Sequence, residues 1–293
     1  MEAFIGLRRG EASKRSEMRG PLLTLEVHER LRRAAREGAE EVECSLDLDR
    51  TVSRVRLHAT VWEWQGTRYP YLEQCKDRTI YYWAGARFEP AARYTTSLIK
   101  LVPTQWGAPT FEIDGIKMLP TSQASPYEDA KQKVALVQPH GKVVLDTCGG
   151  LGYFAAWCLE MGAARVVSYE RSETVLWLRE LNPWSPEGSG ATDHRLIVTH
   201  ADVLERIGDH AANSFDIVLH DPPRFGIAGD LYSQRFYDEL ARVLKRRGKL
   251  FHYVGTPNKL TSGRDVPKEV ATRLQRAGFT TRMTGDGILG VRK

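Results

Sequence analysis

Four carboxylic acids in this sequence each follow a short run of apolar and β-branched residues: Asp146, Glu170, Asp202 and Asp221. Three glycines and an apolar helical stretch come directly after the first of these acids, within residues 147–161. This pattern predicts a strand, a tight turn and the start of a helix. Glycines let the backbone approach a ligand closely, and the free N–H groups at a helix N-terminus attract polar atoms. The chemistry that these residues favour is the binding of a nucleotide-type cofactor.

The spacing of the turn separates it from a dinucleotide site. It reads D-x-C-x-G-x-G from Asp146, with Cys148 where a dinucleotide site has its first glycine. A strand followed by a glycine-rich turn can also be an ordinary structural connection, so the turn by itself leaves both interpretations open. The later acids favour the cofactor. The second predicted strand ends in Glu170, about 20 residues on, which is the separation expected for an acid that binds ribose.

This turn resembles motif I of class I S-adenosylmethionine (SAM) methyltransferases, including a variant common in RNA-modifying enzymes. The runs 125–130, 145–154, 181–184 and 221–237 look like those of a group of archaeal-type predicted methyltransferases. The resemblance covers roughly residues 120–293. It implies an α/β fold with a seven-stranded, mostly parallel Rossmann-like sheet and SAM as cofactor. The cofactor-binding residues that it implies are Asp146, Cys148, Gly149, Gly150, Gly152, Tyr153, Glu170, Arg171, Asp202 and Val203.

The stretch after the fourth strand is the candidate catalytic motif. Asp221-Pro222-Pro223 is similar to the D-P-P-[YFW] motif of amino-group methyltransferases, in which the acid and a proline carbonyl accept hydrogen bonds from the target nitrogen. We therefore expect Asp221 and Pro222 to be catalytic. Arg224 stands where an aromatic residue normally stacks on a base, and it can stack or pair with a phosphate or carboxylate. The expected substrate-binding residues are Tyr127, Pro223, Arg224, Phe225 and His252.

The leading hypothesis is SAM-dependent methylation of a nitrogen in RNA or in a small-molecule amine. One alternative is an aminopropyltransferase that uses decarboxylated SAM on a polyamine, although those enzymes usually carry an acid where Tyr153 follows the last glycine. Another is a non-catalytic SAM-fold module that binds RNA. Cytosine C5 methylation is disfavoured because no cysteine follows Cys158. His220 and His252 are candidate proton acceptors, or else histidines satisfied by neighbouring backbone.

The elements that position these residues are predicted from periodicity. A capped helix opens at Ser125-Pro126 and leads to the first strand. A helix is predicted over 231–245, ending in the basic run 245–249, and strand 250–254 follows it. A last helix over 266–277 and strands 279–283 and 288–291 complete seven strands, counted from Val143.

The first 119 residues are expected to form a separate part of the chain. Residues 1–21 form a basic segment without periodicity, which predicts a disordered tail. Residues 22–119 predict a helix followed by short strands, including a hairpin at Asp114-Gly115. Aromatic residues concentrate in 62–94 among arginines and lysines, so this β-rich lobe either stacks on substrate bases or fills its own core with them.

Composition bounds the remaining choices. Hydrophobic residues make up 42% of the chain and charged residues 27%, as in ordinary globular proteins. No apolar run is long enough for a membrane span, and the N-terminus lacks the apolar region of a secretory signal. The four cysteines are scattered, which predicts neither a metal site nor a disulfide framework and fits a cytoplasmic location. The net charge of +5 permits an RNA partner, or a merely solvated basic surface. It leaves the oligomeric state undetermined.

Overall fold

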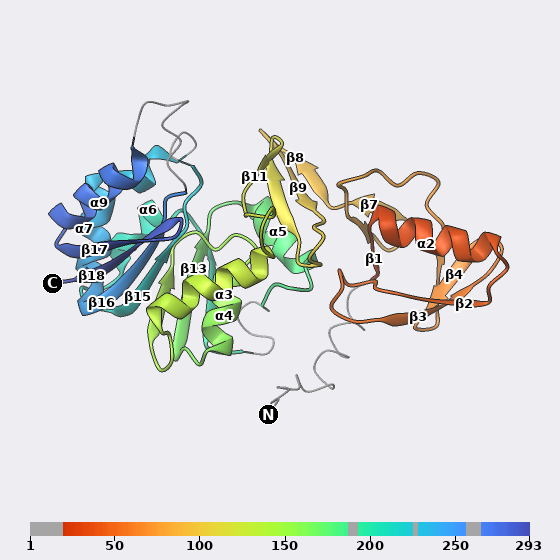
Figure 1. Cartoon of the computed structure of the whole chain (residues 1–293), viewed down its shortest axis with the longest axis horizontal. Helices are drawn as coiled ribbons and strands as arrows, with labels where there is room; N and C mark the ends of the chain where they lie inside the picture. Colours follow the sequence, from red (N-terminus) through yellow and green to blue (C-terminus); the bar gives the residue numbers. More distant parts are fainter. Residues whose placement is uncertain (1–19, 187–192, 225–227, 256–264) are drawn as a thin grey trace. The chain divides into compact units, whose positions relative to one another are not determined.

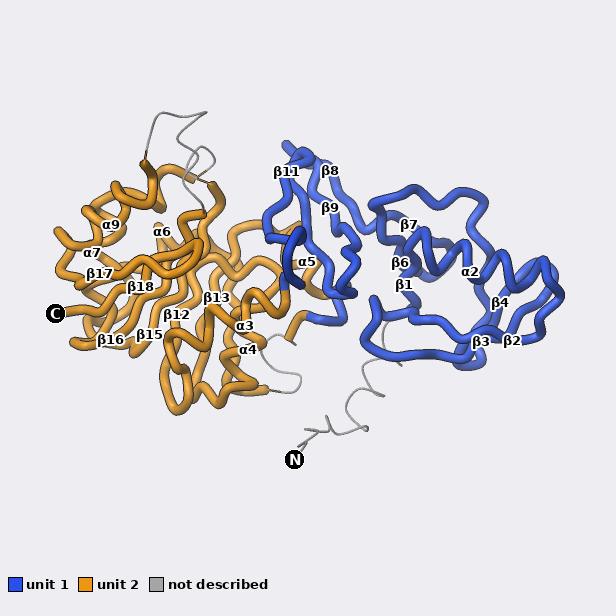
Figure 2. Tube along the Cα trace, viewed as in Figure 1, with its two compact units in different colours: residues 1–126, 181–184 blue, residues 127–180, 185–293 orange. Residues whose placement is uncertain are grey.

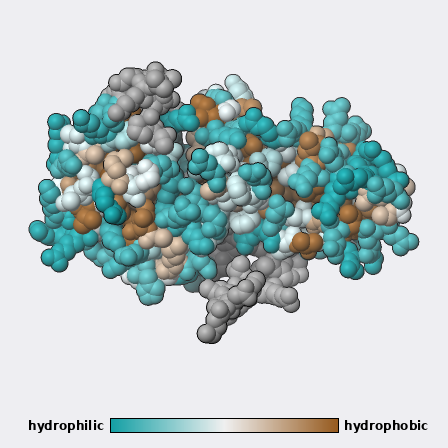
Figure 3. Space-filling view, in the orientation of Figure 1, coloured by the Kyte–Doolittle hydropathy of each residue, from teal (hydrophilic) through white to brown (hydrophobic). Residues whose placement is uncertain are grey.

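The computed structural model describes residues 20–186, 193–224, 228–255 and 265–293, which form two compact units (Figures 1 and 2). Unit 1 holds the chain up to Pro126 together with Leu181–Trp184, and unit 2 holds Tyr127–Glu180 and Ser185–Lys293. The predicted basic tail, apart from its last two residues, lies outside the described residues. On the face drawn in Figure 3, hydrophilic residues predominate and hydrophobic ones are scattered between them. None of the described helices is long and apolar enough to cross a membrane.

Unit 2 is built on a seven-stranded sheet in the order β14-β13-β12-β15-β16-β18-β17, which confirms the predicted fold class. All neighbouring strands are parallel except β18, which runs antiparallel to both β16 and β17. Its strands are β12 (Val143–Asp146), β13 (Arg165–Glu170), β14 (Leu196–His200), β15 (Phe215–His220), β16 (Leu244–Tyr253), β17 (Phe279–Thr284) and β18 (Gly287–Arg292). The helical segments are α3 (Pro126–Val137), α4 (Tyr153–Glu160), α5 (Glu173–Leu181), α6 (Val203–Arg206), η1 (Ile207–Asp209), η2 (Gly229–Tyr232), α7 (Gln234–Val243) and α9 (Val266–Arg276).

The sheet is buried because the middle residues of its central strands are apolar on both faces. Val144 and Leu145 of β12 and Val218 and Leu219 of β15 have no exposed surface. Parallel strands covered on both faces need such continuous apolar runs, since neither face meets water. The resulting core holds β12 and β15 side by side, and it brings their carboxyl ends to the same edge of the sheet.

One predicted boundary in unit 2 is wrong. The helix predicted over 231–245 is a short 3₁₀ turn, η2, followed by α7, which ends at Val243 rather than in the basic run. Leu244 is fully buried and pairs with Phe215, so it already belongs to β16. The register then shifts, and Lys249 pairs with Ile217. Residues 245–248 are therefore a bulge within β16, where Arg247 adopts a left-handed φ of 60°.

Unit 1 consists of a helix and three small antiparallel sheets. The sheets are β1-β6-β7, β2-β3-β4-β5 and β11-β10-β9-β8. Their elements are β1 (Leu22–Leu23), α2 (Leu25–Arg36), β2 (Glu41–Cys44), β3 (Ser53–Leu57), β4 (Val61–Trp64), β5 (Thr67–Pro70), β6 (Tyr81–Trp83), β7 (Phe88–Pro90), β8 (Ala92–Tyr94), β9 (Leu98–Val102), β10 (Thr110–Ile113) and β11 (Ile116–Lys117). The predicted hairpin is present, with Asp114 and Gly115 both at positive φ between β10 and β11.

The aromatic residues of unit 1 mostly fill its core. Trp62 has no exposed surface and stacks on Tyr69, with ring centroids 4.6 Å apart, and on Phe88 at 6.0 Å. Trp83 closes the group through edge contacts with Tyr69 and Phe88, both at 5.1 Å. A small unit needs large side chains to bury enough apolar surface, and these rings supply it.

Candidate functional site

The glycine turn after β12 carries the backbone geometry that the sequence predicts. Gly150 and Gly152 have φ of 50° and 81°, a region that other residues rarely adopt. Gly152 is also the N-cap of α4, so the first N–H groups of that helix lie directly beyond the turn. The Gly149 N–H donates to the Tyr169 carbonyl at 2.7 Å, which fixes the turn to the end of β13.

Glu170 lies beside this turn at the end of β13, and both its oxygens are held by backbone. One oxygen accepts the Gly150 N–H at 3.0 Å, and the other accepts the Ser172 N–H at 2.8 Å. Burial raises the pKa of the Glu170 carboxyl, and these two hydrogen bonds oppose part of that rise. A carboxylate fixed in this way can present its remaining lone pairs to the two hydroxyls of a ribose.

A hollow opens at the same edge of the sheet, and several of the expected cofactor residues line it. They include Cys148, Glu170, Arg171, Asp202 and Val203, and the lining also includes Pro223. Asp202 is the N-cap of α6, because its side chain accepts the Leu204 N–H at 2.9 Å. The hollow is only about 50 Å³, so a bound adenosine requires the surrounding side chains to move apart. The donor and acceptor set nevertheless fits an adenosyl group, with carboxylates at the ends of two neighbouring strands and a glycine turn between helix and sheet.

Two expected cofactor residues lie further inside the protein than the hollow. Asp146 has no exposed surface, and its carboxylate accepts the Ser168 hydroxyl at 2.8 Å. Burial raises the pKa of Asp146 to about 6. Tyr153 is also buried, and its ring meets the Tyr127 ring edge-on at 5.3 Å. These contacts hold the turn and the start of α3 in place, and a direct contact of either residue with the cofactor stays a prediction.

Arg179 is a residue of this region that the sequence analysis missed. Only 4% of it is exposed, and its guanidinium lies beneath the glycine turn. A Cβ on Gly152 would come within 2.6 Å of the Arg179 Cζ, and one on Gly149 within 3.2 Å of its Nη1. The two terminal nitrogens have no hydrogen-bond partner among the described residues. The guanidinium therefore balances the buried charges of Asp146 and Glu170 through space.

Asp221 follows β15, next to the strand that carries the glycine turn. It is partly buried, and burial raises the pKa of its carboxyl to about 7 while the Lys133 ammonium opposes that rise. Within the described part of the chain, no donor lies at hydrogen-bond distance from its carboxylate. The Pro223 carbonyl accepts the Tyr232 hydroxyl at 3.1 Å, whereas the Pro222 carbonyl has no such partner among the described residues. The Asp221 carboxylate and the Pro222 carbonyl can thus still accept hydrogen bonds, which is the role predicted for them toward the target nitrogen.

The remaining expected substrate residues have different placements. Arg224 is exposed, and Tyr127 contacts Trp157 as well as Tyr153. Phe225 lies outside the described residues. His252 has no exposed surface, and its ring nitrogens lie 2.9 Å from the Tyr237 hydroxyl and 2.7 Å from the Tyr253 carbonyl. Burial holds the pKa of His252 well below its usual value, so the neutral ring serves as a fixed packing and hydrogen-bonding group.

His220 resembles His252 in its surroundings. It is fully buried, and its ring nitrogens lie 2.7 Å from the Thr147 hydroxyl and 3.1 Å from the Leu231 carbonyl. Burial lowers its pKa to about 3. With both nitrogens engaged and its charged form disfavoured, His220 matches the interpretation of a histidine satisfied by its neighbours rather than a proton acceptor.

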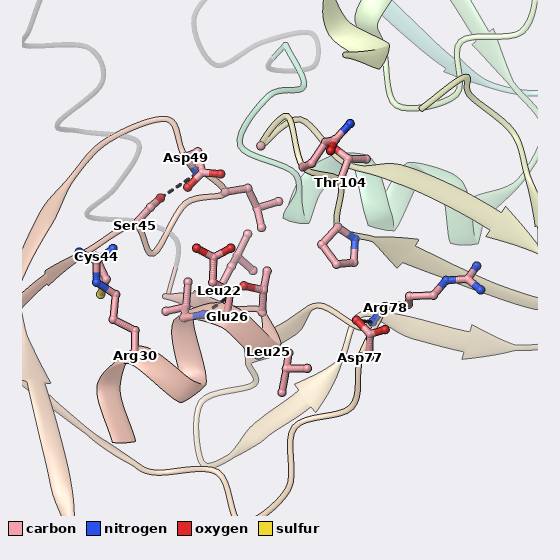
Figure 4. Close-up of a pocket in the computed structure, with 16 residues that line it drawn as sticks. Leu22, Leu25, Glu26, Arg30, Cys44, Ser45, Asp49, Asp77, Arg78 and Thr104 are labelled. Carbon is pink, nitrogen blue, oxygen red and sulfur yellow. Dashed lines mark hydrogen bonds between the residues drawn. The ribbon is translucent and has the colours of Figure 1, made fainter. Parts of the chain in front are cut away.

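A larger hollow of about 290 Å³ lies within unit 1 (Figure 4). Its charged lining residues do not point at one another. Arg30 extends toward Cys44, and Arg78 points away to an ion pair with Glu112. Glu26 and Asp49 are exposed, and burial raises the pKa of the Cys44 thiol to about 11, which leaves it unreactive at neutral pH. No group of three or more histidine, cysteine or acidic residues suited to a metal occurs in the described ranges.

Comparison with solved structures supports the fold. A spermidine synthase in complex with the transition-state analogue AdoDATO superposes with a TM-score of 0.55 and 17% identity over 69% of this chain and 73% of the other. MNMC2 from Aquifex aeolicus gives a TM-score of 0.50 and 16% identity over 69% and 72%. A SAM-dependent methyltransferase from Mesorhizobium loti gives 0.42 and 16% over 58% and 99%. At these identities the first two structures show a shared fold alone, and no conclusion rests on the third.

The sequence comparison is closer. No protein-family model matches the chain. The uncharacterized protein MJ1233 of Methanocaldococcus jannaschii is 42% identical over 213 residues, which are 72% of each protein. With that identity over that length, the chain belongs to the same family as MJ1233.

Proposed function

We propose that this protein is a SAM-dependent methyltransferase that transfers the methyl group to a nitrogen atom, either of RNA or of a small-molecule amine. The observation that carries the proposal is the juxtaposition of two acids at one sheet edge. Glu170 is tied to the glycine turn by the Gly150 N–H, and Asp221 follows β15, which pairs with the β12 strand that leads into the same turn. The first acid suits a ribose, and the carboxylate of the second has no hydrogen-bond donor within the described ranges and can receive an acceptor.

The residues of this site act by binding and orientation. When bound, SAM would supply a methyl group on a positively charged sulfur. A nitrogen lone pair can bond to that methyl carbon, and the sulfur then leaves as S-adenosylhomocysteine. The Asp221 carboxylate and the Pro222 carbonyl accept hydrogen bonds from the N–H groups of the acceptor, which turns its lone pair toward the cofactor side of the site. Orientation of two bound reactants supplies much of the acceleration in such a transfer. The Asp221 carboxylate can also take up the proton that the nitrogen loses.

The test is the substitution Asp221→Asn, which preserves shape and removes the charge. The wild-type protein and methyl-labelled SAM are first incubated with separated RNA, protein and small-molecule fractions to find the labelled product. Turnover with that fraction is expected to fall about 10²–10⁴-fold in the variant, the scale for a positioned acid–base group. SAM affinity should barely change. Asp230→Asn, at an exposed acid nearby in the chain, is the matched control.

Near-normal turnover of Asp221→Asn would show that the acid only caps the turn into the two prolines, where asparagine serves equally well. A parallel incubation with decarboxylated SAM separates methyl transfer from aminopropyl transfer. Product formation from decarboxylated SAM alone would replace the proposed reaction with the aminopropyl one.

A further inference from the structure

Two acids and one lysine of unit 2, Asp129, Asp286 and Lys133, act on the charge of Asp221. Lys133 of α3 is only 5% exposed, and its ammonium pairs with Asp129 at 2.7 Å and with Asp286 at 3.1 Å. Asp286 belongs to the turn between β17 and β18, and its carbonyl accepts the N–H groups that follow β16. We call Asp129, Lys133, Asp221, Tyr253 and Asp286 the ammonium cluster.

The cluster has the chemistry of a binding place for an alkylammonium ion. The Lys133 ammonium lies 4.6 Å from the centroid of the Tyr253 ring, in addition to its two carboxylates. Carboxylates together with an aromatic face are the surroundings that an ammonium group prefers. The chain thus already places one ammonium among these groups, through its own lysine.

The charges of the cluster do not balance. Three carboxylates, those of Asp129, Asp221 and Asp286, share the single positive charge of Lys133. Asp221 has no hydrogen-bond donor among the described residues. Burial raises its pKa, the Lys133 ammonium opposes that rise, and the carboxylates of Asp129 and Asp286 add to it. Enclosed charges are costly unless they are paired, so the site favours a ligand that brings positive charge. A neutral nucleobase nitrogen brings none.

We infer that the methyl acceptor is an aliphatic amine that enters as an ammonium ion and is held by Asp221 with the carboxylates of Asp129 and Asp286. The inference rests on the proposed function and names the substrate class of the same site. The ammonium gives one proton to the Asp221 carboxylate, which becomes a carboxylic acid. The acceptor is left as a neutral amine whose nitrogen lone pair is free. The net charge of the whole chain, +5, does not oppose this, because the local field at the site is set by the groups within a few ångströms.

Binding of simple amines tests the inference without turnover. The protein is saturated with S-adenosylhomocysteine and titrated with butylamine and 1,4-diaminobutane, and with butanol and adenosine as neutral probes. We expect saturable binding of the amines, and none of the neutral probes. Asp286→Asn and Asp129→Asn should each weaken amine binding at least tenfold and leave S-adenosylhomocysteine affinity unchanged.

Glu128→Gln is the matched control on α3, because its side chain is 52% exposed and pairs only with Lys131 among the described residues. It should bind amines like the wild type. Thermal melting of each variant confirms that it is folded, and Asp286→Asn keeps the backbone hydrogen bonds of its turn.

The outcomes separate the two proposals. Failure of the wild type to bind S-adenosylhomocysteine would overturn the proposed function itself. Normal binding of S-adenosylhomocysteine without amine binding would overturn only the amine inference. Equal amine binding by Asp286→Asn, Asp129→Asn and the wild type would do the same, as would methyl label that enters RNA and no amine.

Discussion

Glu170→Gln gives the sharpest test of the cofactor site, because the structure shows what each carboxylate oxygen does. Both oxygens accept a backbone N–H, from Gly150 and from Ser172. Glutamine keeps one acceptor oxygen and turns the other position into a donor, which then faces a backbone N–H. An amide nitrogen also cannot accept a hydrogen bond from a ribose hydroxyl, and loss of one such bond to a charged group costs about 1.5–3 kcal/mol. At about 1.4 kcal/mol per tenfold, this predicts SAM binding roughly 10–150-fold weaker than in the wild type.

Isothermal calorimetry with SAM and S-adenosylhomocysteine measures this change. A sharper readout compares S-adenosylhomocysteine with its 2′-deoxy analogue, since the penalty of the substitution should shrink when a ribose hydroxyl is missing. Glu173→Gln is the control, because Glu173 is exposed in the first turn of the same α5 helix that follows Glu170. Affinity within twofold of wild type in Glu170→Gln would refute the assignment of this acid to the ribose.

Three further predictions concern other parts of the chain. The kcat/KM for methyl transfer should rise with pH through about 7, because burial raises the Asp221 pKa to about 7 and only the ionised carboxylate accepts a proton. If kcat/KM of Asp221→Asn rose with pH in the same way, the assignment of this titration to Asp221 would be contradicted. Gly152→Ala should lose about 1–3 kcal/mol in urea unfolding, from a φ of 81° and a Cβ placed 2.6 Å from Arg179, whereas Gly208→Ala, which meets open space, should change little. Trp62→Ala should lower the free energy of unfolding by about 3–5 kcal/mol, because Trp62 is a core residue. An unchanged unfolding curve would instead favour a role of the Trp62 ring in substrate binding.

Local sequence signals predicted the central sheet well. β15 is observed over Phe215–His220, where a strand is predicted before Asp221, because a mostly apolar stretch between polar turns is typical of a buried parallel strand. The end of α7 was missed for a related reason. Leu244 continues the apolar spacing of the helix, and only its pairing with Phe215, far away in the sequence, draws it into β16.

The charged residues inside the site were harder to predict, although a signal for them existed. Lys133 lies three residues after Ala130 and four before Val137, and Arg179 lies four residues after Val175; these three apolar residues are buried. Helical periodicity therefore places both cations on the buried faces. Whether a buried cation is tolerated depends on partners elsewhere in the chain, and Asp286, which pairs with Lys133, is 153 residues away. Local patterns do not contain that information.

The short return of the chain to unit 1 at Leu181–Trp184 bears on how this protein can change by recombination. Within that unit, the Trp184 indole donates to the Leu48 carbonyl at 2.8 Å, and the Arg50 guanidinium donates to the Pro183 carbonyl at 2.6 Å. A single genetic crossover near residue 126 would exchange most of unit 1 and leave this four-residue piece behind from the other parent. The piece would then meet a foreign loop in place of Leu48 and Arg50. Viable chimaeras of relatives should therefore inherit residues 48–50 and 181–184 from the same parent. We therefore expect unit 1 not to be exchanged between relatives independently of residues 181–184.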